Sequence, residues 1–277
     1  MTPGRASQTA VMVCMARAVA HGISLNDPTA LALLPEAERA RVERFRAGER
    51  ARGFRARMYE VQLVGRAHMM TARTLAIDES IRTAAAPQVV ILGAGLDGRA
   101  WRMAELRDAI VFEVDHPDTQ RDKRARTAHL APTAREVRFT AVDFTRDSLD
   151  DALAGAGHDA TRPTTWVWEG VVMYLRQAEI EASLAVIDRR SAPGSRIVIA
   201  YHRPSPILWI VKPIVRRLGE PIHSVFTPDA MHALIAQYRF EVVRDEDVRA
   251  IGARLSPEIA KATRMLRHMG IVTADRG

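Results

Sequence analysis

Cysteine is nearly absent, because Cys14 is the only one in 277 residues. A disulfide framework and a cysteine-based zinc site each need several cysteines, so both are excluded, and we expect no metal site. A single thiol in a chain of this length is typical of a reducing compartment. We therefore expect the protein to be cytoplasmic.

Long hydrophobic runs are also missing. No stretch reaches the roughly 18 apolar residues that a membrane-spanning helix requires. Near the N-terminus, Arg17 interrupts the apolar run from Ala10 to Ala20 and no cleavage pattern follows, so a secretory signal is not expected. We therefore expect no membrane partner.

Lysine and aromatic residues are scarce, at three lysines and 5% aromatics, so arginine carries most of the formal net charge of +7. Arginines gather between Arg39 and Arg57, but glutamates and alanines are interspersed, a pattern typical of a solvated helix face. With so few aromatics, we expect no nucleic-acid partner. The proportions of 47% hydrophobic and 26% charged residues are those of an ordinary globular protein.

The order of helical and strand-like segments predicts an α/β fold. Residues 1–86 favour helices, and Pro87 ends that pattern. Short β-branched runs then alternate with helical segments, which predicts a largely parallel sheet covered on both faces. We expect 1–86 to form a helical cap and 87–277 the core of one domain. Strands are predicted at Gln88–Leu92, Ala109–Val114, Glu136–Val142, Thr165–Trp168, Arg196–Ala200, Phe240–Arg244 and Gly270–Thr273, and helices at Asp118–Ala128, Gln177–Arg190 and Pro257–Met269.

The residues that follow the strands matter most, since ligands bind beyond the carboxyl ends of such strands. The segment Gly93–Gly98 follows the first strand and matches the dinucleotide motif G-x-G-x-x-G. Asp115 lies 20 residues beyond Gly95, where a carboxylate can accept hydrogen bonds from an adenosine ribose. NAD and S-adenosylmethionine both carry that ribose, so these residues leave the cofactor open.

Two further acidic residues follow strands. Asp143 can accept a hydrogen bond from an adenine amino group, and the backbone N–H of Phe144 can contact the ring. Glu169, followed by Gly170, is placed to face a cationic ligand such as a sulfonium or an ammonium group. Without a ligand, Asp143 would be a turn residue and Glu169 a helix cap, and these are the alternatives to the ligand-binding interpretation.

Four blocks in this order resemble the leucine carboxyl methyltransferase family, a broad group of class I S-adenosylmethionine-dependent methyltransferases that includes bacterial natural-product enzymes. The similarity covers roughly residues 60–245, and Gly98 departs from it because the family usually has threonine there. The blocks are Gln88–Asp97, Phe112–Pro117 with Lys123, Val142–Phe144 and Glu169–Leu175.

The resemblance implies a Rossmann-like core with a largely parallel, seven-stranded sheet flanked by helices. It also implies S-adenosyl-L-methionine as cofactor and S-adenosyl-L-homocysteine as product. By resemblance, the cofactor's methionine part would lie along Gly93, Ala94 and Gly95, its ribose at Asp115, its adenine between Asp143 and Phe144, and its amino-acid end near Glu169. The segment Thr71–Thr74 matches a family segment whose arginine meets the cofactor carboxylate, so Arg73 is that candidate; a helix-surface ion pair is its alternative.

The acceptor is less constrained by the sequence. We favour O-methylation, at a hydroxyl or a carboxylate, of a small and partly apolar natural-product-type molecule. An insertion at about residues 203–226 carries several prolines around the apolar run Ile207–Val211, which predicts a lid, or equally a core helix or a dimer contact. A homodimer is therefore possible. The candidate bases are His116, His202 and His223, and no catalytic residue is assigned.

Two other functions compete with methyl transfer. A nicotinamide-dependent oxidoreductase would use the Gly93–Gly98 loop, but no tyrosine stands four residues before any lysine, as short-chain dehydrogenases require. It would also leave Asp143 and Glu169 unexplained. A non-catalytic, methyltransferase-like binding module is the second alternative.

Overall fold

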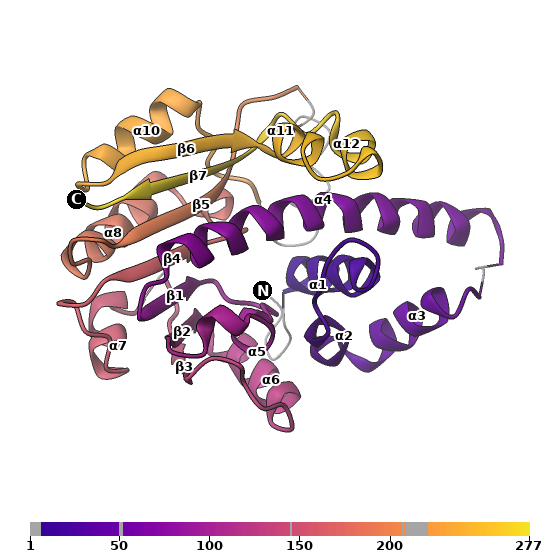
Figure 1. The fold of residues 1–277 in the computed structure, drawn as a ribbon, viewed down its shortest axis with the longest axis horizontal. Helices are drawn as coiled ribbons and strands as arrows, with labels where there is room; N and C mark the ends of the chain where they lie inside the picture. The colour runs from indigo at the N-terminus through magenta and orange to yellow at the C-terminus, as the bar shows by residue number, and fades with distance from the viewer. Residues whose placement is uncertain (1–6, 50–51, 145, 207, 209–220) are drawn as a thin grey trace.

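The computed structural model describes residues 7–49, 52–144, 146–206, 208 and 221–277. Seven strands form one sheet in the order β3-β2-β1-β4-β5-β7-β6 (Figure 1). Strands β1 to β5 run parallel to one another, whereas β7 is antiparallel to both β5 and β6. The strands are β1 (Gln88–Leu92), β2 (Ile110–Asp115), β3 (Glu136–Ala141), β4 (Thr164–Trp168), β5 (Arg196–His202), β6 (Glu241–Asp247) and β7 (Met269–Asp275).

Helices cover both faces of the sheet. They are α1 (Gln8–Ala20), α2 (Thr29–Leu33), α3 (Glu36–Arg46), α4 (Phe54–Ala84), α5 (Arg99–Arg102), α6 (Pro117–Thr127), α7 (Leu149–Gly155), α8 (Gln177–Arg189), α10 (Pro228–Ala236), α11 (Val248–Ala253) and α12 (Pro257–Thr263), with short 3-10 turns η1 (Ala104–Leu106) and η2 (Val172–Tyr174). No helix among the described residues is long and apolar enough to cross a membrane.

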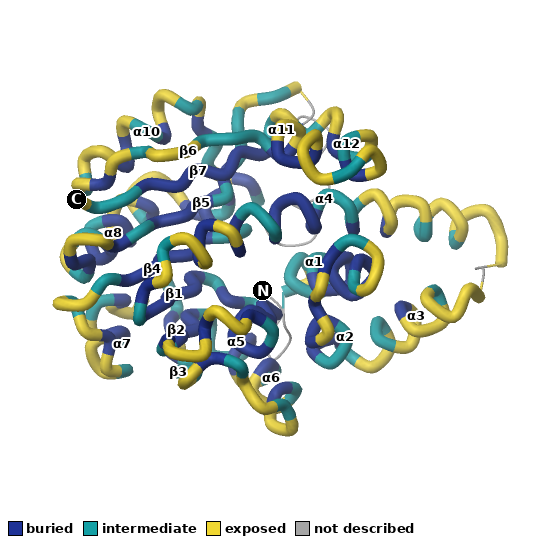
Figure 2. The backbone as a smooth tube through the Cα atoms, in the orientation of Figure 1, coloured by how far each residue is buried: buried dark blue, intermediate teal, exposed yellow. Residues whose placement is uncertain are grey.

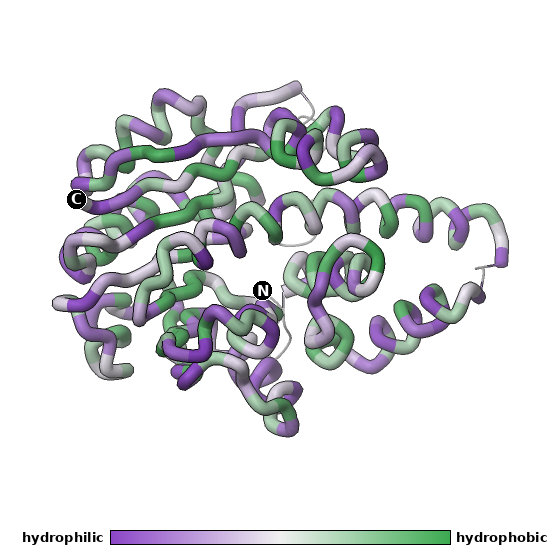
Figure 3. Tube along the Cα trace, viewed as in Figure 1, coloured by the Kyte–Doolittle hydropathy of each residue, from purple (hydrophilic) through white to green (hydrophobic). Residues whose placement is uncertain are grey.

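The central strands are buried because both of their faces are covered. All five residues of β1 and of β4 are buried, and hydrophobic residues concentrate in this centre (Figure 3). Side chains alternate between faces along a strand. Val90 and Leu92 accordingly pack in one core cluster with Trp166 and helix α8, whereas Val89 and Ile91 pack in another with helix α4.

The sequence predicted the elements well and some of their ends poorly. The predicted strands are all present, but β5 runs on to His202 and β6 to Asp247, because pairing with β7 continues that far. The helix predicted over Pro257–Met269 ends at Thr263, since Met269 pairs with His202 in the sheet. Much of the predicted lid, residues 207 and 209–220, lies outside the described residues.

Candidate functional site

The loop that follows β1 lies at the carboxyl end of the sheet. It is packed closely against the segment after β4 and against helix α1. Gly93 and Gly95 have φ angles of 69° and 47°, which side-chain-bearing residues rarely adopt. A Cβ on Gly93 would lie 2.1 Å from Val171, and one on Gly95 would lie 3.2 Å from Ala10 of α1. The N–H groups of Gly93 and Ala94 both donate to the carbonyl of residue 114 in β2. Glycine is therefore required here for both conformation and space.

Asp115 connects this loop to the neighbouring strand β2 by a hydrogen bond. It is the last residue of β2 rather than the first residue after it, and its carboxylate accepts hydrogen bonds from the N–H groups of Gly95 and His116. Burial raises the pKa of Asp115, and these hydrogen bonds oppose that rise. An acceptor group thus lies directly beside the glycine loop.

Asp143 and Phe144 lie at the same edge, beyond β3. The N–H of Asp143 donates to the carboxylate of Asp147 over 2.8 Å, and Phe144 packs partly buried against the main core cluster. Since β3, β2, β1 and β4 are neighbours in the sheet, the segments that follow them lie in one row. Along that row come Asp143, Asp115, the glycine loop and Glu169.

Glu169 and Arg73 form a buried ion pair. Arg73 Nε lies 2.7 Å from Glu169 Oε1, and Arg99 Nη1 donates to Glu169 Oε2 over 2.8 Å. Burial would raise the pKa of Glu169, but Arg73 and Arg99 outweigh it and lower the pKa to about 2. Arg73 is only 7% exposed, so the ion pair is buried and not on the helix surface, as the alternative expected.

Arg99 was not predicted, although it lies at the centre of the site. Its guanidinium is fully buried and pairs with three carboxylates: Asp78 at 2.7 Å, Glu169 at 2.8 Å, and Asp97. Asp78 also pairs with Arg102 of α5, which in turn lies near Asp27 in the N-terminal region. Four arginines and four acidic residues make up this buried network: Arg17, Arg73, Arg99, Arg102, Asp27, Asp78, Asp97 and Glu169.

One sequence signal could have revealed the network. Arg17 interrupts an apolar helical run, and a charged residue on a buried face needs a partner. In the structure its Nε lies 3.4 Å from Asp27, and its guanidinium also donates to the carbonyl of Leu96 beside the glycine loop. The N-terminal helices are therefore anchored to the site by charge.

Gly98, the last glycine of the dinucleotide motif, has a packing role. A Cβ at this position would lie 2.2 Å from the hydroxyl oxygen of Thr29 in α2. The absence of a side chain at Gly98 thus makes room for the N-terminal region. Nothing in this contact requires a dinucleotide.

The three candidate histidines occupy different environments. His116 caps the start of α6, where its Nδ1 accepts from the N–H of Asp118 over 3.3 Å. His223 is exposed. His202, at the end of β5, is largely buried, and its Nδ1 has no hydrogen-bond partner among the described residues. Burial, with smaller contributions from His268 and Arg73, lowers the pKa of His202 to about 4.

The lowered pKa of His202 predicts a loss of stability in mild acid. A histidine with an ordinary pKa of about 6.5 in the unfolded chain binds a proton there before it does in the fold. The free energy of unfolding should therefore fall as the pH drops from 6.5 to 4, and His202→Gln should reduce that fall by roughly 1–3 kcal/mol. Urea unfolding across this pH range measures the effect. The exposed His223→Gln is the matched control, and equal slopes for the two variants would contradict the prediction.

The chain is similar in sequence to known proteins of one family. Residues 10–188 match the family described as "Leucine carboxyl methyltransferase". Two relatives carry names that begin "Putative S-adenosyl-L-methionine-dependent methyltransferase". One, from Streptomyces coelicolor, is 40% identical over 134 residues, which is 47% of each chain. The other, from Mycobacterium avium, is 44% identical over 133 residues, 46% of this chain and 42% of the relative. The chain spans about half the length of the curated relatives it matches.

Solved structures share the arrangement of the sheet and helices. A DUF574-family protein from Streptomyces avermitilis superposes with a TM-score of 0.60 at 14% identity, covering 99% of both chains. A "putative methyltransferase" from Thermobifida fusca gives a TM-score of 0.57 at 18% identity, covering 95% of this chain and 94% of the other. At such low identity the likeness concerns the fold alone.

Proposed function

The chain belongs to the leucine carboxyl methyltransferase family, and from this premise we propose that it methylates an oxygen atom of a small molecule, with S-adenosyl-L-methionine as donor. The predicted class I methyltransferase fold is confirmed by the sheet order and the structural neighbours. The main observation in support of the proposal is that four candidate binding groups lie in a row along the carboxyl edge of the sheet. Asp143, Asp115, the glycine loop and Glu169 follow one another there, matching the donor's adenine, ribose, methionine chain and amino group.

The Arg73–Glu169 pair suits the amino-acid end of the donor, which carries a carboxylate and an ammonium group. Arg73 Nε lies close to Glu169 but makes no well-aligned hydrogen bond. We infer that Arg73 exchanges Glu169 for the donor carboxylate, with which a guanidinium can form two parallel hydrogen bonds. Arg99 then keeps Glu169 ionised and in place to accept from the ammonium.

When bound, the donor supplies a methyl group on a positively charged sulfur. The chain's residues would contribute binding and orientation, since an acceptor held in line at about 3–3.5 Å gains much of its rate from position alone. An ionised carboxylate acceptor needs no base. For a hydroxyl acceptor, His202 is our candidate to accept the proton, because its buried imidazole is neutral at pH 7.

An apolar cluster next to the site supports a partly apolar acceptor. Met173, four residues after Glu169 in the chain, is buried together with Leu208 and Ile222, and the N–H of His223 donates to the carbonyl of Met173 over 2.8 Å. The described ends of the 203–226 insertion therefore pack against the segment that follows β4. We propose that these described parts, residues 203–206 and 221–226, lie beside the acceptor.

Calorimetric titration with S-adenosylmethionine and S-adenosylhomocysteine tests the proposal, with NADH and NADPH as controls. We expect micromolar binding of the two sulfur compounds only. A screen of small hydroxyl and carboxyl compounds with radiolabelled donor then tests transfer to oxygen. Binding of a nicotinamide cofactor alone would overturn the proposal in favour of an oxidoreductase. Donor binding without transfer to any acceptor would favour a binding module.

A further inference from the structure

A helical arm projects from the body of the protein (Figure 1). We define the arm as residues 36–49 and 52–66, which comprise α3 and the first part of α4. Most residues along this part of α4 are exposed, and hydrophobic and hydrophilic residues alternate (Figures 2 and 3). Phe54 is 78% exposed, Val61 65% and Met58 43%. Exposed large apolar side chains this close together call for an explanation.

These side chains share one face of α4. Phe54, Met58 and Val61 recur at intervals of four and three residues, the spacing of a single helix face. The opposite face carries Leu63, which is buried in the N-terminal core cluster. Further along α4, Ala72 is buried in a cluster with residues of α11 and α12. The outer part of α4 therefore has a second apolar face with no cover among the described residues.

The end of the arm is strongly basic. Between residues 44 and 57, the described residues include five exposed arginines and one glutamate, Glu49. Arg44, Arg46, Arg52 and Arg55 form no ion pair with any described acidic residue. An apolar helix face flanked by arginines is the pattern of a helix that lies in the surface of an anionic membrane.

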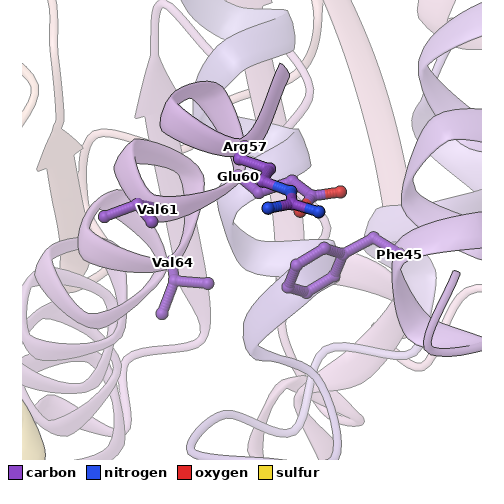
Figure 4. A pocket seen from close by; sticks show the side chains of 5 residues that line it. All are labelled: Phe45, Arg57, Glu60, Val61 and Val64. Atoms are coloured by element: carbon purple, nitrogen blue, oxygen red, sulfur yellow. The ribbon is translucent and has the colours of Figure 1, made fainter. Parts of the chain in front are cut away.

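A groove between the two helices adds room for apolar groups. It has a volume of about 520 Å³ and is lined by Phe45 of α3 and by Arg57, Glu60, Val61 and Val64 of α4 (Figure 4). Arg57 and Phe45 face each other across it. A cationic group beside an apolar wall suits a molecule with an anionic head and a hydrocarbon tail.

We propose that the arm binds the surface of a membrane rich in anionic phospholipid. The projecting position of the arm lets its end reach a flat surface before the rest of the molecule does (Figure 1). A second copy of the chain is a poorer occupant, because two such ends would bring like charges together. This proposal departs from the expectation of no membrane partner. That expectation rested on the absence of a spanning segment, and a surface contact needs none.

Co-sedimentation with vesicles tests the proposal without any methyl-transfer assay. Vesicles of phosphatidylcholine alone are compared with vesicles that also contain phosphatidylglycerol. We expect binding to the anionic vesicles only, weakening as salt is raised. Arg55→Gln with Arg57→Gln should weaken it roughly thirtyfold. Phe54→Ser with Met58→Ser should weaken it roughly tenfold or more.

Matched variants outside the arm serve as controls. Ile23→Ser with Met265→Ser removes two apolar side chains that are 72% and 76% exposed. Arg249→Gln with Arg264→Gln removes two exposed arginines. Both pairs should leave vesicle binding unchanged. Absence of binding by the unaltered protein, or equal losses in arm and control variants, would overturn the proposal. So would light scattering that shows a dimer dissociated by the Phe54→Ser, Met58→Ser pair.

Discussion

Replacing Arg99 with methionine should lower the free energy of unfolding by about 3–5 kcal/mol. Arg99 is fully buried, and its guanidinium is shared by Asp78, Asp97 and Glu169. Methionine fills a similar volume, but it removes the positive charge that these three carboxylates share. Their hydrogen bonds to the guanidinium are also lost. A buried charge that loses its partner is costly because water cannot replace the partner.

Urea unfolding followed by circular dichroism measures the Arg99 effect. Arg107→Met is the matched control, because Arg107 is exposed a few residues further along, and it should change stability by less than about 0.5 kcal/mol. Arg99→Lys keeps the charge but cannot reach three carboxylates at once, so its loss should be intermediate. If the methionine variant fails to fold, the free energy of unfolding is measured on the lysine variant instead. Equal losses for Arg99→Lys and Arg107→Met would contradict the role of the network.

Replacing Arg73 with alanine should weaken S-adenosylmethionine binding by about 10- to 100-fold, which corresponds to the loss of a hydrogen bond to a charged group. The proposed function places the donor carboxylate on Arg73. Decarboxylated S-adenosylmethionine lacks that carboxylate, so its affinity should change much less. The difference between the two ligands separates a contact with the carboxylate from a general disturbance of the site.

Calorimetry with both ligands checks the Arg73 prediction. Arg66→Ala, two turns earlier on α4, is the control and should bind both ligands as the unaltered protein does. Equal losses of affinity for the two ligands in Arg73→Ala would remove the carboxylate from Arg73. The loss of the Arg73–Glu169 contact itself is common to both titrations and cancels in the comparison.

The buried network also joins the N-terminal helices to α5 and α4 by ion pairs. Arg17 of α1 and Asp27 before α2 connect through Arg102 to Asp78 of α4. Because the network holds equal numbers of positive and negative groups, it can be buried without a net charge. Removing the N-terminal helices would leave Arg102 without one of its acidic partners.

The sequence by itself determined the sheet, the loops at its edge and the family. Continuous apolar runs such as residues 89–92 identify buried strands because that pattern is local and depends on no distant partner. The same logic located the glycine loop, Asp115 and Glu169 at strand ends.

Only the tertiary structure decided how the charged residues are paired. Glu169 lies 70 residues beyond Arg99 and 96 beyond Arg73, and no local pattern tells which of the many arginines will meet it. Likewise, the contact with Thr29 that excludes a side chain at Gly98 joins helix α2 to a distant loop. Periodicity in the sequence indicates which face of a helix or strand is buried. The partner of a buried charge instead depends on which distant segments of the chain the fold brings together.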